Sequence, residues 1–123
     1  ESKEEHFSLA KKLYAGGKFD DAIFLFEKFV EIYPSEKETV GQSYYLLGEI
    51  YKKLADIGKT SAEIDKFYKK SEISYQKIIE MFDNGLREEA LFKMGHVLKT
   101  MGNSEGALLA FKELLEKHKN SKH

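Results

Sequence analysis

The chain has 123 residues, and 41% of them are hydrophobic, which suits a single domain with a core of its own. Its 20 basic and 21 acidic residues give a net charge of −1, which argues against a nucleic-acid partner or a strongly basic membrane-binding surface. It contains no cysteine, which excludes disulfides, thiolate metal sites and thiol nucleophiles within these residues, and no apolar run approaches the roughly 20 residues that span a bilayer.

Apolar residues recur at helical spacing along the chain, without the alternation typical of strands, so the pattern predicts an all-α protein. We predict helices, in chain order, over residues 4–15, 19–33, 40–57, 61–82, 86–101 and 104–119. Gly16 and Gly17 end the first helix, Pro34 ends the second, and Ser61 is the expected N-cap of the fourth. The polar tail 120–123 is expected to fray. Short turns join the helices in pairs, which predicts three antiparallel hairpins.

Two segments far apart in the chain repeat the same pattern. The stretch GKFDDAIFLFEKFVEIYP at 17–34 and the stretch GNSEGALLAFKELLEKHK at 102–119 share small and aromatic positions, including Ala22/Ala107 and Phe26/Phe111. One hairpin cannot bury its own apolar face, so repeated hairpins stack and share a core. We therefore predict one domain over 1–123, with repeats at about 3–36, 41–84 and 87–120.

The spacing within each hairpin resembles the tetratricopeptide (TPR) repeat pattern W-x2-L-G-x2-Y, A-x3-F, P. The clearest example is Tyr44-x2-Leu47-Gly48-x2-Tyr51, with tyrosine in place of tryptophan. The other matching positions are His6, Leu9, Ala10, Leu13, Ala22, Phe26 and Pro34 in the first repeat, and Leu91, Met94, Gly95, Leu98, Ala107 and Phe111 in the third. The resemblance implies a right-handed α-solenoid of three hairpins.

The spacing departs from the family's period of 34 residues. Ala10, Gly48 and Gly95 are separated by 38 and then 47 residues, and most of the second excess lies around 55–70. Ser71 and Tyr75 then take the usual alanine and phenylalanine places. We therefore expect the second hairpin to be elongated and to project beyond its neighbours.

No motif indicates catalysis, and we predict that the protein is not an enzyme and holds no metal or cofactor. The four histidines, His6, His96, His118 and His123, show no metal-ligand spacing. The carboxylate pairs Asp20-Asp21 and Glu88-Glu89 open helices, where negative charge complements the helix dipole. The serines have no base at a recognisable spacing.

The resemblance to TPR proteins implies that the first helix of each hairpin lines a concave face that binds a protein or peptide partner. Phe7, Tyr45 and Phe92 hold the same place in the three repeats and form the expected aromatic ladder. The other expected groove residues are Lys11, Tyr14, Glu49, Lys52, His96 and Lys99. An amphipathic helix or extended peptide would suit this face. The alternative is that the aromatic residues pack between the repeats. A dicarboxylate clamp is disfavoured, because only Lys11 and His96 could serve in it.

The junctions EIYPSEKETVGQSYYLLGEIY and EMFDNGLREEALFKMGHVLKTMGN resemble a TPR subgroup of bacterial cell envelopes. That subgroup includes BamD-like lipoproteins of outer-membrane β-barrel assembly and a periplasmic coordinator of the Tol–Pal system. The likeness implies a periplasmic location or the periplasmic face of the outer membrane. The likeness also implies a removed leader and a membrane tether through a lipid-bearing cysteine just before Glu1, where the chain opens without methionine.

Two alternatives stay open at this point. The protein could be cytoplasmic, or it could be a structural subunit of a larger cytoplasmic or envelope machine. Such a subunit would use its convex face and elongated second hairpin, where Phe67 and Tyr68 lie. The sequence leaves the partner and the oligomeric state undetermined.

Overall fold

The computed structural model describes residues 2–120, and the side chains of residues 2–116. Six helices follow one another along the chain: α1 (Lys3–Ala15), α2 (Phe19–Ile32), α3 (Lys37–Asp56), α4 (Ser61–Met81), α5 (Gly85–Thr100) and α6 (Ser104–Asn120). No strand occurs in the described part of the chain. The prediction of an α-solenoid built from three helical hairpins is confirmed. Of the tail at 120–123, expected to fray, Asn120 is the last residue of α6, and residues 121–123 lie outside the described residues.

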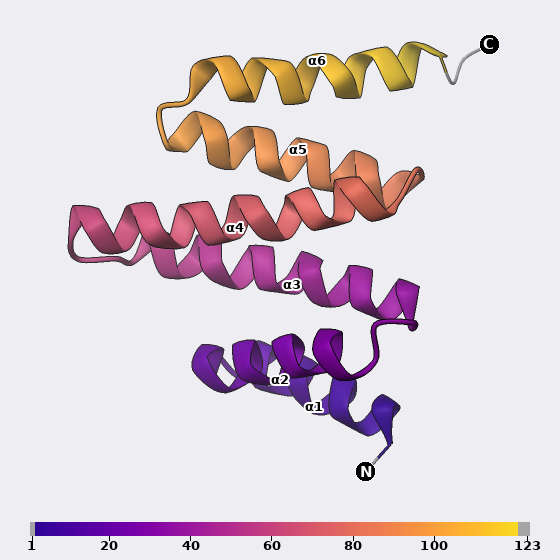
Figure 1. The fold of residues 1–123 in the computed structure, drawn as a ribbon. Coiled ribbons are helices and arrows are strands. Elements are labelled where there is room, and N and C mark those ends of the chain that lie inside the picture. Colours follow the sequence, from indigo (N-terminus) through magenta and orange to yellow (C-terminus); the bar gives the residue numbers. More distant parts are fainter. Residues whose placement is uncertain (1, 121–123) are drawn as a thin grey trace.

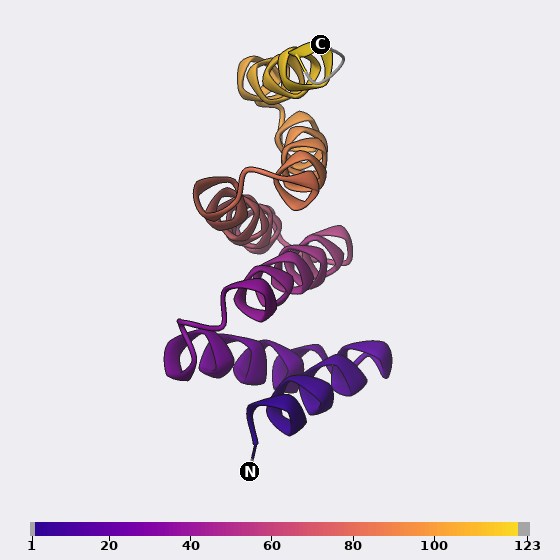
Figure 2. The same cartoon turned by 90° about the vertical axis from the view of Figure 1, so that its right-hand side faces the viewer.

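The helices stack in one elongated column, with the two ends of the chain at opposite ends of the stack (Figure 1). The column also twists. Figure 2 shows α5 and α6 nearly along their axes, whereas α1 and α2 are seen from the side. We call α1, α3 and α5 the first helices, and α2, α4 and α6 the second helices.

Residues with special backbone requirements set the hairpin turns. Gly17 and Gly102 adopt φ angles of 75° and 88°, which explains why glycine recurs at this place in the first and third hairpins. The prediction that Ser61 caps the fourth helix is wrong by one residue. Thr60 has extended backbone angles, and its side chain accepts the backbone N–H of Glu63 at 3.1 Å. Both residues carry a hydroxyl, so only the backbone geometry distinguishes them.

Each hairpin is held together by an aromatic ring of the second helix against a small residue of the first. A Cβ atom built on Gly48 would lie 2.6 Å from the ring of Tyr75, and one on Gly95 would lie 2.5 Å from Phe111. Tyr75 is fully buried. The hydroxyl of Ser71, in the usual alanine place, donates to the carbonyl of Gly48 at 2.8 Å, so this buried polar group is satisfied.

The second hairpin is elongated, as expected. Its helices have 20 and 21 residues, against 13 and 14 in the first hairpin. Its tip extends beyond the other two turns in Figure 1. Ala55 and Tyr68 are buried in this extension, whereas Ile57 at the turn is 70% exposed. None of the helices among the described residues is long and apolar enough to cross a membrane.

The ring-on-glycine packing predicts that Gly48→Ala lowers the free energy of unfolding. The added methyl group must displace the buried ring of Tyr75, which costs about 1–3 kcal/mol. This loss outweighs a gain in helix propensity of up to about 1 kcal/mol. Urea denaturation followed by circular dichroism measures the difference.

Gly85→Ala is the matched control, because nothing lies within 4 Å of a Cβ at this first residue of α5. Its stability should equal or exceed that of the parent protein. Equal stabilities for the Gly48 and Gly85 variants would contradict the packing argument.

Candidate interaction surfaces

The nine side chains predicted to bind a partner all project from the first helices. They fall into three regions of one face: Phe7, Lys11 and Tyr14 on α1; Tyr45, Glu49 and Lys52 on α3; Phe92, His96 and Lys99 on α5. The structure brings Tyr14, Tyr45 and Glu49 together, and it leaves the two outer phenylalanines in separate hollows.

The first region is centred on Phe7, which is only partly exposed. Its ring lies 5.9 Å from that of Phe26 and 5.7 Å from that of Phe29, so one side packs into the hairpin. The ammonium group of Lys11 lies 4.9 Å from the centre of the Phe7 ring. A small hollow of about 150 Å³ opens beside Phe7 and Lys11. Lys3 and Glu36, paired at 2.9 Å, form part of its lining.

The second region is a polar junction around Glu49. The hydroxyl of Tyr75 donates to Glu49 Oε1 at 2.7 Å, and Lys93 Nζ lies 3.3 Å from the same oxygen. The ring of Tyr45 meets that of Tyr75 edge-on at 6.0 Å. Glu49 therefore already binds groups of α4 and α5, and much of the middle of the predicted groove is internal packing.

Burial and nearby charges shift the pKa values of the titratable side chains at this junction. Burial raises the pKa of Tyr14 and of Tyr45, and burial together with the hydrogen bond to Glu49 raises the pKa of Tyr75 strongly. Burial alone would lower the pKa of Lys93, but the charge and hydrogen bond of Glu49, together with Tyr45 and Glu89, raise the pKa overall. Lys93 is therefore a charged ammonium group at neutral pH.

The third region is the most open of the three. Phe92 is 49% exposed, and its ring contacts the ring of His96 at 4.6 Å. The ring of His96 also lies 5.3 Å from that of Phe111 on α6. His96 therefore makes edge-to-face contacts with both Phe92 and Phe111. A hollow of about 470 Å³ lies between Tyr45 and Phe92, with Lys93 at its wall. Lys99 is exposed farther along α5.

Lys52 has a local partner at the base of the elongated tip. Its ammonium group lies 3.0 Å from Asp56, which also accepts the hydroxyl of Tyr68 at 2.6 Å. Burial would raise the pKa of Asp56, but the hydrogen bonds from Tyr68 and Lys52 lower it overall. The hydrogen bond to Asp56, with burial, raises the pKa of Tyr68 to about 12. Tyr68 is thus a buried part of the tip, and Phe67 stacks on Tyr51 at 6.2 Å.

Lys93 was missing from the predicted site residues, although it directly follows Phe92. The sequence could have indicated a binding role for Lys93, because it comes directly after the aromatic ladder position of the third repeat. Its partner Glu49 comes from a different helix, so the sequence alone did not show the pairing.

No group of three metal-ligating side chains occurs within the described residues. His6, in the place of the signature tryptophan, packs edge-on against Phe29 and Tyr33, and its Nε2 lies 2.9 Å from the carbonyl oxygen of Leu25. The side chains of His118 and His123 lie outside the described part.

Comparison with protein families identifies the repeats. The family model "Tetratricopeptide repeat" matches residues 7–35 and 89–121, just over half of the chain. The chain belongs to the tetratricopeptide repeat family. The TPR match covers most of the first and third hairpins and leaves out the whole elongated second hairpin. A comparison with curated proteins gave no match. TPR repeats mediate protein–protein interactions.

The junction around Glu49 predicts that Glu49→Ala lowers the free energy of unfolding by about 1–3 kcal/mol, because the buried Tyr75 hydroxyl loses its acceptor. Glu49→Gln, which keeps an acceptor oxygen, should lose less. Chemical denaturation measures both. The control is Glu80→Ala on the exposed surface of α4, which should change stability by less than about 0.5 kcal/mol. A Glu49→Ala variant as stable as this control would show that the junction does not stabilise the fold.

The hydrogen bond from Tyr68 to Asp56 at the tip predicts that loss of the Asp56 charge changes the alkaline titration of Tyr68. In Asp56→Asn the pKa of Tyr68 should fall from about 12 toward its usual 10.0, because the charged acceptor is gone. Since the folded protein holds this proton more tightly than the unfolded chain, its contribution to stability is complete below pH 10 and is lost as pH rises toward 12. Ultraviolet absorbance of the phenolate follows the titration, and Tyr68→Phe identifies the band. An unchanged titration in Asp56→Asn would refute the assignment.

Proposed function

We propose that this TPR protein is a non-catalytic scaffold that binds a protein or peptide partner on the face formed by its first helices. The supporting observation is the pair of hollows at Phe7 and Phe92, one on each side of the Glu49 junction. Each hollow has an aromatic wall and a lysine beside it. The family's general role in protein–protein interaction supports the same conclusion.

The two hollows suit a partner that inserts apolar side chains separated by polar residues. Phe92 contributes most, because about half of its surface is exposed and its ring is held by His96. An apolar side chain seated between Tyr45 and Phe92 would bury apolar surface on both sides. Lys11, beside the first hollow, would pair with an acidic group of the partner. At the second hollow Lys93 is already paired with Glu49, and Glu88 and Glu89 in its lining would favour a basic group of the partner.

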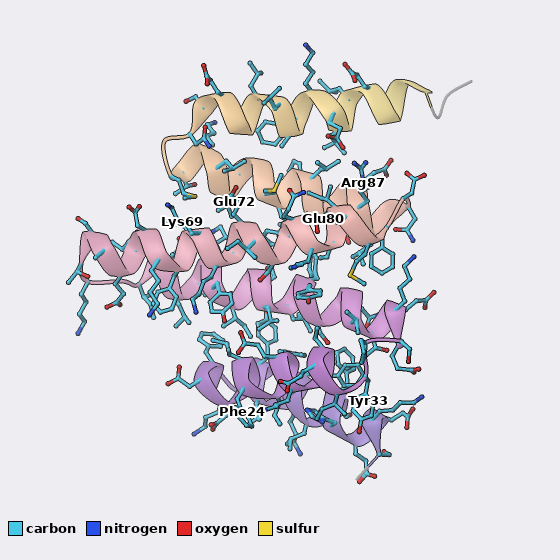
Figure 3. All side chains as sticks on the ribbon, in the orientation of Figure 1. Phe24, Tyr33, Lys69, Glu72, Glu80 and Arg87 are labelled. Carbon is cyan, nitrogen blue, oxygen red and sulfur yellow. The ribbon has the colours of Figure 1, made fainter. Side chains whose placement is uncertain are left out.

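This proposal predicts that Phe92→Ala weakens binding of the native partner by about tenfold or more, because it removes the exposed aromatic wall. The partner is first isolated with the unaltered protein, and calorimetry then gives the dissociation constants. The control is Phe24→Ala on α2, where the ring is 58% exposed and lies on a second helix (Figure 3). The proposal fails if Phe92→Ala, folded as judged by circular dichroism, binds the partner as tightly as Phe24→Ala does.

One structural feature favours the alternative of a subunit in a larger machine. The elongated second hairpin projects beyond the stack and carries Ile57, 70% exposed, at its turn (Figure 1). A machine subunit would use this tip as a contact. Loss of assembly in Ile57→Asp, with assembly retained in Phe92→Ala, would support the alternative over the scaffold proposal.

The cell-envelope location is a separate proposal, supported by the likeness of the two junctions to envelope TPR proteins of the BamD-like and Tol–Pal-associated types. The periplasmic face of the outer membrane would require a leader and a lipid-bearing cysteine upstream of Glu1. Sequencing of the full precursor and cell fractionation test this. A precursor without such a leader would favour the cytoplasmic alternative.

A further inference from the structure

A hollow of about 350 Å³ lies on the other side of the solenoid, between the second helices α2 and α4. The Cα atoms of these two helices stay more than 8 Å apart, so α3 forms the floor between them. The floor consists of Tyr44, Leu47 and Tyr51, and Val30 and Ile73 contribute apolar walls. We call this hollow the α2–α4 groove. Ile73 is 57% exposed, although it lies on an otherwise well-packed helix.

The next gap along the stack, between α4 and α6, shows why this one is open. There Arg87 of α5, labelled in Figure 3, donates from Nε to the carbonyl of Ile79 on α4 at 3.2 Å and pairs with Glu113 on α6. Superposing the Gly48/Gly95 and Tyr75/Phe111 places puts Val40 where Arg87 stands and Lys77 where Glu113 stands. Valine and lysine cannot form that bridge at this place in the groove.

The walls of the α2–α4 groove carry opposite charges. Glu27 and Glu31 line it from α2, whereas Lys70 and Lys77 line it from α4. Tyr51 fixes one end of this arrangement. Its hydroxyl donates to Glu27 at 3.0 Å, and the ammonium group of Lys70 lies 5.4 Å from its ring centre. Toward the other end, the side chain of Glu31 is 70% exposed and lies 3.6 Å from the ammonium group of the exposed Lys28, so this ion pair stays open to water.

We propose that the α2–α4 groove binds an amphipathic helix of a partner protein, with basic residues along one edge of its apolar stripe and acidic residues along the other. The apolar floor takes the stripe, and each charged wall pairs with the edge of opposite sign. Charges of one sign on both edges would face repulsion from one wall. This site lies on other helices than the Phe92 face, so it goes beyond the proposed function and can fail independently of it.

The test uses three cross-linked helical peptides that share one leucine stripe. One has lysines on one edge and glutamates on the other, the second has lysines on both edges, and the third has glutamates on both edges. Exchanging the two edges would not be informative, because the helix could then bind in the reverse direction. We expect the mixed peptide to bind the full chain about tenfold more tightly than either companion at low salt, and added salt should reduce the difference.

Variants locate the binding. Ile73→Ala should lower the affinity for the mixed peptide by about fivefold or more, because the variant lacks one apolar wall of the groove. Ile57→Ala is the matched control, since Ile57 is 70% exposed and lies at the hairpin tip. Lys77→Glu should reduce the advantage of the mixed peptide over the peptide with lysines on both edges. Phe92→Ala should leave all three affinities unchanged.

Methyl chemical shifts in nuclear magnetic resonance spectra complete the test, with changes expected at Val30, Leu47 and Ile73. The proposal is overturned if the mixed peptide binds no more tightly than the other two peptides, or if Ile73→Ala binds it as tightly as Ile57→Ala does. It is equally overturned if the chemical-shift changes occur around Phe92 instead. It is also overturned if the protein self-associates and Ile73→Ala abolishes this, since a second copy would then occupy the groove. Circular dichroism confirms that each variant is folded.

Discussion

The structure depends on the contact between one aromatic ring and one small residue in each hairpin. Tyr75 against Gly48 and Phe111 against Gly95 bring the two helices so close that an added methyl group would overlap the ring. Phe26 and Ala10, both fully buried, repeat the arrangement in the first hairpin. Because the ring fills the space between the two helices, each hairpin keeps an apolar side for its neighbour, and stacking buries it.

Stacking gives the two sides of the solenoid different chemistry. On the first-helix side, the Glu49–Lys93 pair and the Tyr75 hydroxyl join two neighbouring hairpins, leaving hollows on both sides of the junction. On the second-helix side, the Cα atoms of successive helices stay more than 8 Å apart, so the residue that reaches across each gap decides whether it is bridged. Arg87 crosses one gap, and Val40 leaves the other without such a bridge.

The elongated hairpin follows the same rules over a greater length. Its extra turns bury Ala55 and Tyr68, and the Tyr68–Asp56–Lys52 hydrogen bonds satisfy the polar groups beside them. These added turns keep Gly48 opposite Tyr75, so the stack accommodates them without a change of register. The extension therefore projects as a separate feature beyond the contact between Gly48 and Tyr75.

The sequence by itself determined the class of fold, the number of helices and the elongation of the second hairpin, because helical periodicity, glycine turns and the TPR spacing are local properties of the chain. It also placed Phe7, Tyr45 and Phe92 on equivalent positions. Only the tertiary structure decided that Phe92 is half exposed whereas Tyr45 is more deeply buried, since burial depends on which helix lies opposite. Ile23 and Leu108 hold the same place in the repeat, yet Ile23 packs against the core and Leu108 is 68% exposed. The pairing of Glu49 with Lys93 and the open α2–α4 groove arise between helices far apart in the chain, where local patterns carry no information about distance.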